Sequence, residues 1–261
     1  MNTSAATPAL FLSHGPPAVA VRDCPARRFL MQLGRALPRP RAIISVSAHW
    51  ESVAPLVTGD PEPGILHDFG GPASLHRLAY DLKGAPDLAE QIIARLAREG
   101  TPAQHQTRPF DHGTWIPLRL IYPEGDIPAV QLSIQTEERP EHHYRLGQTL
   151  APLRESGVLI MASGGAVHNL DEAWEHAFDD TPPSYVRRFD RWLEDAIVNG
   201  RGEALLGYQK KAPDPLRCHP YPAEHFLPLF VALGAAGGIA GRRLHDSFIM
   251  GTLSMAAYLW D

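Results

Sequence analysis

The sequence is poor in cysteine and has no long apolar run. Its 261 residues include two cysteines, Cys24 and Cys218, which form no CxxC pair and cannot build a disulfide framework. No stretch approaches the roughly 18 to 20 uninterrupted apolar residues that a membrane-spanning helix requires. Residues 1–4 contain no basic side chain, so we expect no secretory signal peptide. Together these absences predict a soluble, cytoplasmic protein that does not insert into a membrane.

Positive charge is not in excess either. The chain has 24 Lys and Arg against 29 Asp and Glu, a formal net charge of -5, which argues against nucleic-acid binding. Low-complexity segments, Gly/Ser linkers and repeats of roughly 20 to 50 residues are also absent. With 44% hydrophobic and 20% charged residues, the composition is that of a globular protein. We therefore expect one domain over residues 1–261, with a homo-oligomer as the generic possibility.

Proline and histidine, by contrast, are abundant. The chain has 25 prolines and 13 histidines. Histidine is the commonest metal ligand and the side chain that titrates nearest to neutral pH. The positions of the histidines therefore carry most of the functional information.

Apolar runs bounded by glycine and proline alternate with helical patterns. Such alternation is typical of βαβ units and predicts an α/β fold, a single α/β/α domain whose mostly parallel central sheet is flanked by helices. The expected strands are residues 8–12, 41–48, 129–134, 158–162 and a closing strand at 247–258. The expected helices are residues 26–37, 87–99, 140–156, 185–199 and 223–236.

Three histidines follow three of these strands. His14 comes two residues after the apolar run that ends at Leu12, and His49 ends the second strand. His168 follows the strand at 158–162 through a glycine-containing turn. In open α/β sheets, ligands bind in the crevice beyond the carboxyl ends of the strands. We therefore expect these three imidazoles to converge there.

Two further histidines are candidates for the same site. His112 lies in a predicted loop with turn residues on both sides, and His225 opens the predicted helix at 223–236. His67 is ambiguous. We interpret the following as surface or hydrogen-bonded core residues: His76, His105, His142, His143, His176 and His245.

The histidine set predicts a particular class of metal. Neutral imidazoles suit Zn(II), Fe(II), Cu or Ni, whereas Mg and Ca prefer oxygen ligands. Three imidazoles with open coordination positions are typical of catalytic sites rather than structural ones. The motifs GxxxxGK[ST] and GxSxG are absent, and the glycines at 234–241 lack dinucleotide-binding spacing. The residues by themselves predict a metalloenzyme.

Five motifs in order along nearly the whole chain resemble one enzyme family. The family is that of the class III extradiol ring-cleavage dioxygenases, in the single-chain branch typified by 4,5-DOPA extradiol dioxygenase. Its fold is a single α/β domain. The motifs are Ser13-His14-Gly15, Ser45-Val46-Ser47-Ala48-His49-Trp50, Asp111-His112-Gly113-Thr114-Trp115, Gly164-Gly165-Ala166-Val167-His168-Asn169-Leu170 and Glu224-His225-Phe226-Leu227-Pro228-Leu229.

The resemblance implies one non-haem divalent metal, Fe(II) for activity or Zn(II) as bound. His14, His49 and His225 would be its ligands. His168 would lie close to the metal, either as a further ligand or as the catalytic acid/base, and His112 would be a second proton-handling or oxygen-orienting group. The implied partners are O2 and a small aromatic substrate, a catechol or aminophenol, whose ring is opened beside the diol by insertion of both oxygen atoms.

The substrate pocket is less closely defined. The resemblance places His67 and its loop, residues 67–72, at the pocket. Trp50 and Trp115 follow site histidines and would either stack on the substrate ring or serve as core aromatics beside the site.

Two carboxylates are candidates for hydrogen bonds to site histidines, since metal-bound histidines commonly donate their other N–H to a carboxylate. They are Glu224, beside His225, and Asp111, beside His112. An all-histidine site also leaves the metal its full charge, which favours an anionic catecholate and also admits zinc. A zinc-dependent hydrolase and a non-catalytic metal-binding protein on the same fold are the alternatives.

Overall fold

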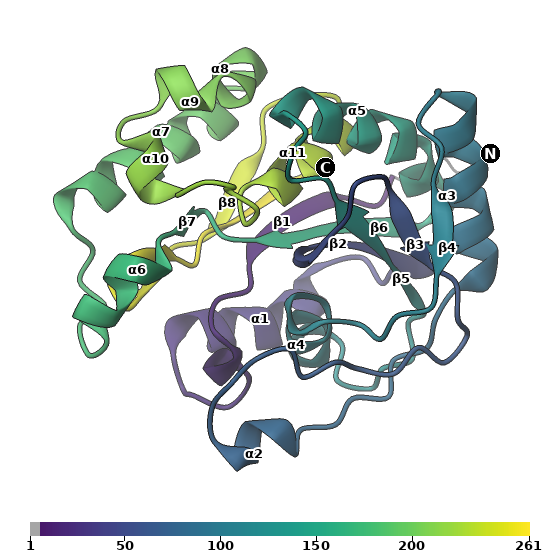
Figure 1. The fold of residues 1–261 in the computed structure, drawn as a ribbon, viewed down its shortest axis with the longest axis horizontal. Helices are drawn as coiled ribbons and strands as arrows, with labels where there is room; N and C mark the ends of the chain where they lie inside the picture. Colours follow the sequence, from purple (N-terminus) through teal and green to yellow (C-terminus); the bar gives the residue numbers. More distant parts are fainter. Residues whose placement is uncertain (1–5) are drawn as a thin grey trace.

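An eight-stranded sheet forms the centre of the computed structural model, which describes residues 6–261 (Figure 1). Residues 1–4, on which the expectation of no signal peptide was based, lie outside the described residues. The strands are, in spatial order, β4 (Gln104–Gln106), β3 (Leu56–Thr58), β5 (Ala129–Ile134), β2 (Ala42–Glu51), β6 (Val158–Gly164), β1 (Ala9–Ser13), β11 (Ala257–Trp260) and β8 (Arg242–His245).

The four central strands of this sheet are parallel. β1 pairs with β6, β6 with β2, and β2 with β5, all in the same direction. β3 and β4 are also parallel, whereas the β5–β3, β1–β11 and β11–β8 pairs are antiparallel. The predicted α/β domain with a mostly parallel sheet is therefore confirmed. A second, three-stranded sheet joins β7 (Val167–His168), β10 (Leu253–Ser254) and β9 (Phe248–Ile249).

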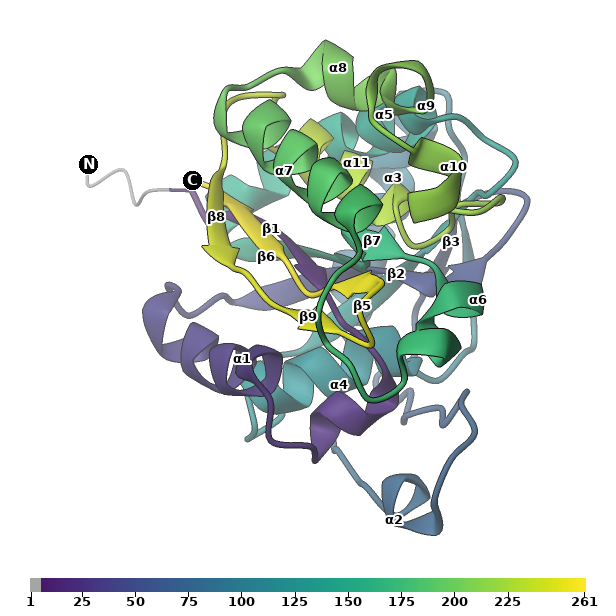
Figure 2. The same cartoon turned by 90° about the vertical axis from the view of Figure 1, so that its left-hand side faces the viewer.

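Helices cover both faces of the large sheet. α3, α5, α7 and α11 lie on one face, and α1 and α4 lie on the other (Figures 1 and 2). The helices, with η marking a 3₁₀ helix, are η1 (Pro17–Ala20), α1 (Pro25–Ala36), α2 (Ala73–His76), α3 (Pro86–Arg98), α4 (His112–Ile121), α5 (Pro140–Leu150), η2 (Ala151–Ser156), α6 (Leu170–Ala173), η3 (Trp174–His176), α7 (Ser184–Val198), α8 (Gly202–Leu206), α9 (Tyr208–Lys211), α10 (Pro215–Cys218) and α11 (Leu227–Ala235).

The two layers of helices explain the unbroken apolar runs of β1 and of the first five residues of β6. In β1, Ala9 and Phe11 belong to the core shared with α5, α7 and α11. Leu10 and Leu12 belong to the core shared with α1 and α4. A strand buried on both faces needs apolar residues at every position rather than at every second one. The polar residues that follow such a strand are then the first ones free to form a site.

Most predicted elements are confirmed within one to three residues at each end. The strands are β1, β2, β5 and β6, and the helices are α1, α3 and α7. The helix predicted at 140–156 is present as α5 followed directly by the 3₁₀ helix η2. No helix in the described part of the chain is long and apolar enough to cross a membrane.

The predicted closing strand at 247–258 is wrong as a single element. The structure divides it into β9, β10 and β11. Met250 and Gly251 both have positive φ angles, 50° and 62°. Two successive residues in this region reverse the chain and end a strand. Only β11, at the end of the segment, joins the large sheet.

The predicted helix at 223–236 begins later than expected, at Leu227. Pro228 lies in its first turn, where a missing N–H has no cost. Further inside a helix, the proline ring would clash with the carbonyl of the residue four positions earlier, Glu224. His225 therefore lies in the turn before α11 rather than in the helix itself.

Candidate active site

Five histidines from separate elements meet beyond the carboxyl ends of the parallel strands. The predicted convergence of His14, His49 and His168 is confirmed. The ring centroids of His14 and His49 lie 4.9 Å apart, and that of His168 lies 3.5 Å from that of His225, whose centroid is 5.2 Å from that of His14. His112, predicted in a loop, is the first residue of α4. His225, from the turn before α11, completes the group, which we call the histidine cluster.

The shortest contacts in the histidine cluster join three Nε2 atoms. His49 Nε2 lies 3.0 Å from His14 Nε2 and 3.3 Å from His225 Nε2. His168 stacks on His225, with centroids 3.5 Å apart and planes inclined by 7°. His14, His49 and His112 also each offer a nitrogen within 4.8 Å of the other two. The structure thus presents two overlapping sets of three histidines, of which only the first contains the predicted ligand His225.

Two glycines allow the backbone to approach this closely. A Cβ on Gly113 would lie 2.4 Å from Ser47 Oγ and 3.1 Å from His49 Cδ2. A Cβ on Gly164 would lie 2.1 Å from the carbonyl oxygen of His225. The distances of 2.4 and 2.1 Å are far below a normal contact, so a side chain at either position would displace Ser47 or the backbone of His225.

The ring of His14 is held by Ser163 at the end of β6. The Ser163 hydroxyl donates to the carbonyl of Gly113 at 2.5 Å and lies 3.0 Å from His14 Nδ1. A hydroxyl has one proton, and here the carbonyl accepts it, so Nδ1–H of His14 donates to Ser163. In a neutral imidazole the other nitrogen, Nε2, is then unprotonated and has a free lone pair.

The ring of His225 is held in the same way by Glu224. His225 Nδ1 lies 2.7 Å from Glu224 Oε1, so the predicted contact between these neighbours is confirmed. The ring nitrogen donates to the carboxylate, which leaves the Nε2 lone pair directed at His49. Both residues lie before α11, which lets adjacent side chains turn toward each other.

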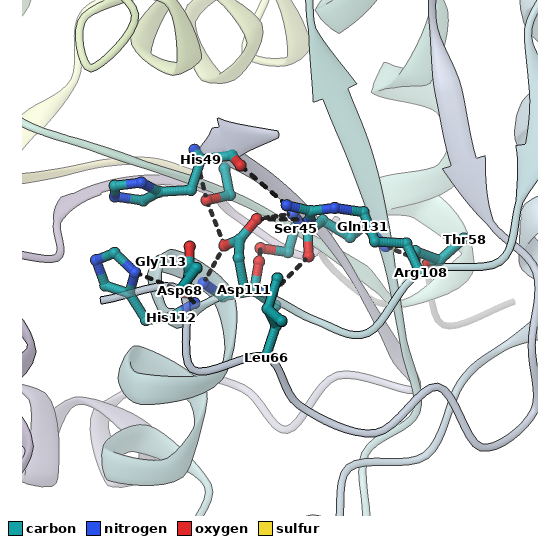
Figure 3. Close-up of polar contacts among 12 residues, drawn as sticks. Ser45, His49, Thr58, Leu66, Asp68, Arg108, Asp111, His112, Gly113 and Gln131 are labelled. Carbon is teal, nitrogen blue, oxygen red and sulfur yellow. Dashed lines mark hydrogen bonds and ion pairs between the residues drawn. The ribbon is translucent and has the colours of Figure 1, made fainter. Parts of the chain in front are cut away.

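The ring of His112 has a partner that the sequence did not indicate. Its Nδ1 lies 2.9 Å from Asp68 Oδ1, and its backbone N–H donates to the same oxygen at 3.0 Å (Figure 3). The prediction that Asp111 fills this role is wrong. Asp111 is instead the N-cap of α4 and accepts from the backbone N–H of Thr114.

Asp111 is the centre of a buried polar network below the histidine cluster. Its fully buried carboxylate accepts from Ser47 Oγ at 2.7 Å, from Arg108 Nη1 at 3.0 Å and from Gln131 Nε2 (Figure 3). Arg108 also donates to the carbonyl of His49 at 3.0 Å. A buried carboxylate with this many donors costs about 3–5 kcal/mol to unpair. The network therefore ties the end of β2 to the start of α4.

Four histidines of the cluster, His14, His49, His168 and His225, have lowered pKa values and are neutral at pH 7. Burial, followed by the charges of neighbouring histidines, lowers the pKa of His14 and His225 well below its usual value. Burial and His112 lower the pKa of His49 to about 4, against the opposing effect of Asp111. Burial and His219 lower the pKa of His168 to about 3. The site therefore presents uncharged nitrogen ligands.

These nitrogens fit a divalent cation. The lone pairs of His14 and His225 both face His49 Nε2, and that atom has at most one proton to share between them. Nitrogens bonded to one metal at about 2.1 Å lie about 3.0 to 3.4 Å apart in octahedral or tetrahedral geometry. The observed separations of 3.0 and 3.3 Å fall in this range. A metal would be held by neutral imidazoles and would satisfy all three lone pairs.

The three predicted substrate contacts lie away from the open part of the site. Trp115 is fully buried and donates to the carbonyl of Leu66. Trp50 is buried, and the Arg108 guanidinium lies 5.0 Å from its ring centroid. His67 Nε2 donates to the backbone carbonyl of Leu78, and its ring lies 5.3 Å from that of Trp115. These placements favour the interpretation of both tryptophans as core aromatics beside the site.

A cavity of about 170 Å³ opens beside the stacked pair of histidines. Negative and neutral side chains line it, and neither lysine nor arginine contributes to its walls. The lining residues are His168, Leu170, Asp171, His219, Pro220, Tyr221, Pro222, Ala223, Glu224 and His225.

Comparison with known proteins gives consistent results. The chain matches the family model for the catalytic LigB subunit of aromatic ring-opening dioxygenase over residues 8–258. It is 41% identical to a protein of Beta vulgaris named 4,5-DOPA dioxygenase extradiol, over 95% of this chain and 94% of that one. A protein of the same name from Escherichia coli (strain K12) is 37% identical, over 97% of this chain and 94% of that one.

A solved structure shares the fold. The crystal structure of an uncharacterized protein from Escherichia coli K12 superposes with a TM-score of 0.81 at 33% identity, covering 98% of this chain and 100% of that chain. The family match also spans all five motifs on which the resemblance was based. The chain therefore belongs to the LigB family of aromatic ring-opening dioxygenases and is an oxidoreductase.

Proposed function

We propose that the chain is an extradiol dioxygenase that opens a catechol ring with O2, using one divalent metal held by His14, His49 and His225. The observation that carries this proposal is the position of His49 Nε2, which lies 3.0 Å from His14 Nε2 and 3.3 Å from His225 Nε2. The Nε2 atoms of His14 and His225 have free lone pairs because the Nδ1–H group of each ring donates a hydrogen bond to an oxygen, of Ser163 and Glu224 respectively.

His225 rather than His112 is the third ligand in this proposal. His225 Nε2 lies 3.3 Å from His49 Nε2, whereas within the described residues no comparable contact joins a ring nitrogen of His112 to His14 or His49. The resemblance also places the third ligand in the motif that contains His225. His112 remains beside the metal, where its ring faces that of His49 at a centroid distance of 4.0 Å.

When bound, the metal supplies Lewis-acid activation, which lowers the pKa of a catechol hydroxyl. The chain supplies the side chains that accept and return the proton of the substrate hydroxyl. His168 is neutral and lies against the cavity, so a ring nitrogen is available to take a proton from the substrate hydroxyl and return it to the product. Fe(II) is the proposed metal for activity, and Zn(II) would bind the same ligands without supporting reaction with O2.

The substrate is proposed to be a catechol. The names of the relatives from Beta vulgaris and Escherichia coli make DOPA the first compound to assay. The cavity walls include Asp171 and Glu224 but no lysine or arginine. This lining favours a catechol that carries an amine over one that carries only a carboxylate. An aminophenol would fit the same description of the reacting ring.

The test is reconstitution of the metal-free chain under anaerobic conditions. Fe(II) should restore O2 consumption and formation of a yellow ring-opened product from DOPA, and Zn(II) should not. Loss of bound metal in His225→Ala, with full metal content in the exposed control His76→Ala, would support the ligand set. Zinc-dependent ester hydrolysis without O2 consumption would instead support a hydrolase. Absence of turnover with every catechol and aminophenol would overturn the proposal.

A further inference from the structure

The segment from Leu66 to Phe69 crosses the start of α4 and brings a carboxylate to the ring of His112. Asp68 Oδ1 accepts two hydrogen bonds from this one residue, at 3.0 Å from the backbone nitrogen and at 2.9 Å from Nδ1 (Figure 3). The two side chains are largely buried, with exposed fractions of 18% for Asp68 and 7% for His112. Within residues 6–261, Asp68 is the only side chain that forms a hydrogen bond with the His112 ring.

The contact defines which ring nitrogen is protonated. Burial raises the pKa of Asp68, but the hydrogen bonds and charge of His112 outweigh it and hold the pKa below its usual value. An ionised carboxylate only accepts hydrogen bonds. Nδ1 of His112 is therefore the donor, and in the neutral ring Nε2 is an acceptor.

The carboxylate is held in place by the segment on which it lies. Trp115 Nε1 donates at 2.9 Å to the carbonyl of Leu66, two residues before Asp68. His67 Nε2 lies 3.1 Å from the carbonyl of Leu78, so the next residue is also anchored. Side chains that are held by their own neighbours keep a ring in one orientation without reorganising during a reaction. Asp68 is thus preorganised against the start of α4.

We propose that Asp68 is a positioning residue that makes Nε2 of His112 a hydrogen-bond acceptor for the substrate. The inference rests on the proposed function, which puts His112 beside the metal and substrate. It decides between the two roles that the resemblance leaves open for His112. An acceptor at Nε2 binds the hydroxyl of a catechol, whereas orientation of O2 would need a donor there. His112 is therefore assigned to the substrate hydroxyl.

The direct test is the tautomer of His112 in the full-length, zinc-loaded chain, read from ¹⁵N NMR of the histidine rings. The His112 signals are assigned by their loss in His112→Gln. The wild type should show a protonated Nδ1. Asp68→Ala should move the proton in part or fully to Nε2, whereas Asp68→Asn, which retains an acceptor oxygen, should preserve Nδ1–H. A wild-type ring protonated at Nε2, or a spectrum unchanged by Asp68→Ala, would overturn the proposal.

Activity provides the second arm. Asp68→Ala should lower kcat for a catechol about 10–100-fold at unchanged metal content, as is typical for partners of site histidines, and Asp68→Asn should recover most of it. The exposed control Asp81→Ala should match the wild type. An altered tautomer with unchanged kcat would also contradict the proposal.

The two arms separate this inference from the proposed function. If the wild type turns over no catechol, the proposed function fails while the NMR arm still measures the effect of Asp68 on the ring. If Asp68→Ala does not fold, Asp68→Asn is compared with Asp68→Glu. Both variants retain an oxygen that can accept the hydrogen bond, but the Glu side chain is one methylene group longer. The proposal would then be contradicted if Nδ1–H were lost in Asp68→Asn, whose side chain has the length of the wild-type Asp, but retained in Asp68→Glu.

Discussion

The histidine cluster has a held side and a free side. On the held side, the Nδ1 atoms of His14, His112 and His225 each have an oxygen partner, at 3.0, 2.9 and 2.7 Å. On the free side, the ring of His168 has no hydrogen bond within the described chain and only stacks on His225. Rings with a defined proton position suit binding, whereas a ring that can use either nitrogen suits proton transfer.

The two sides also come from different parts of the fold. The held histidines lie on or beside the large sheet, and their partners are Ser163 on β6, Asp68 in the segment before α2, and the neighbouring Glu224. His168 ends the two-residue strand β7 of the small sheet and lines the cavity. Along the chain, β7 is followed by α6 (Figure 2). In the proposed function, the large sheet therefore supports the metal ligands and the small sheet supplies the group that handles the proton.

The largest effect is expected at His49, whose Nε2 lies between those of the held rings of His14 and His225. His49→Ala removes the nitrogen that lies between the other two, so bound metal and activity should both be lost. The loss should exceed the about 10–100-fold that removal of a ligand's partner costs. Metal analysis of the purified variant measures it, with the exposed His105→Ala as control. Full metal content in His49→Ala would contradict the proposed ligand set.

The next effect is expected on the free side. His168→Phe retains a flat ring against His225 and removes both nitrogens. If His168 handles the proton, kcat should fall about 10²–10⁴-fold while metal content remains that of the wild type. Steady-state kinetics and metal analysis of the same preparation give both values. Loss of metal in this variant would instead identify His168 as a ligand and would remove the distinction between the two sides.

A smaller effect is expected from the partners of the held rings. Ser163→Ala removes the acceptor of the His14 Nδ1 proton and should weaken metal binding about 10–100-fold. The matched control is Ser45→Ala, since Ser45 is also buried in a central strand but bonds to Thr114 instead of a histidine. Competition with a chelator of known affinity measures the change. Equal losses in the two variants would show that the effect comes from core packing.

The smallest effect is expected at His143, a buried histidine outside the cluster that should affect the stability of the chain but not its metal content. His143 is fully buried on α5, accepts from the backbone N–H of Gln135, and has its pKa lowered by burial to about 3. In the unfolded chain its pKa is about 6.5, so below that pH only the unfolded state binds the proton. The free energy of unfolding should therefore decrease as the pH is lowered below about 6.5, and the contribution of His143 to this decrease should reach about 2 kcal/mol at pH 5.

Urea unfolding near neutral pH and at about pH 5 tests this, with His143→Gln as the comparison. The variant should lose less stability on acidification than the wild type, and its metal content should be unchanged. Parallel loss in both proteins would show that His143 does not contribute to the acid sensitivity.

Much of the fold could be predicted because its signals are local. Doubly covered strands such as β1 favour continuous apolar runs, and glycine and proline mark their ends. α4 was missed because its sequence, with Gly113, Trp115 and Pro117, has low helix propensity. That helix depends on burial and on the Asp111 cap, which are properties of the folded chain.

The positions of the site histidines were also predictable, but their partners were not. A histidine that follows a buried strand is visible in sequence. The contacts of Asp68 with His112 and of Ser163 with His14 join residues 44 and 149 positions apart. No periodicity or short motif connects such pairs. The only local signal at Asp68 was a carboxylate between His67 and Phe69 in a turn-rich segment.

The most direct test of the account is anomalous X-ray scattering from crystals of the chain purified without added metal, collected at the iron and zinc absorption edges. We expect one peak bonded at about 2.1 Å to the Nε2 atoms of His14, His49 and His225, with His112 and His168 nearby but not bonded. A peak in which His112 replaces His225, or a site that binds no ion at any concentration supplied, would contradict the account.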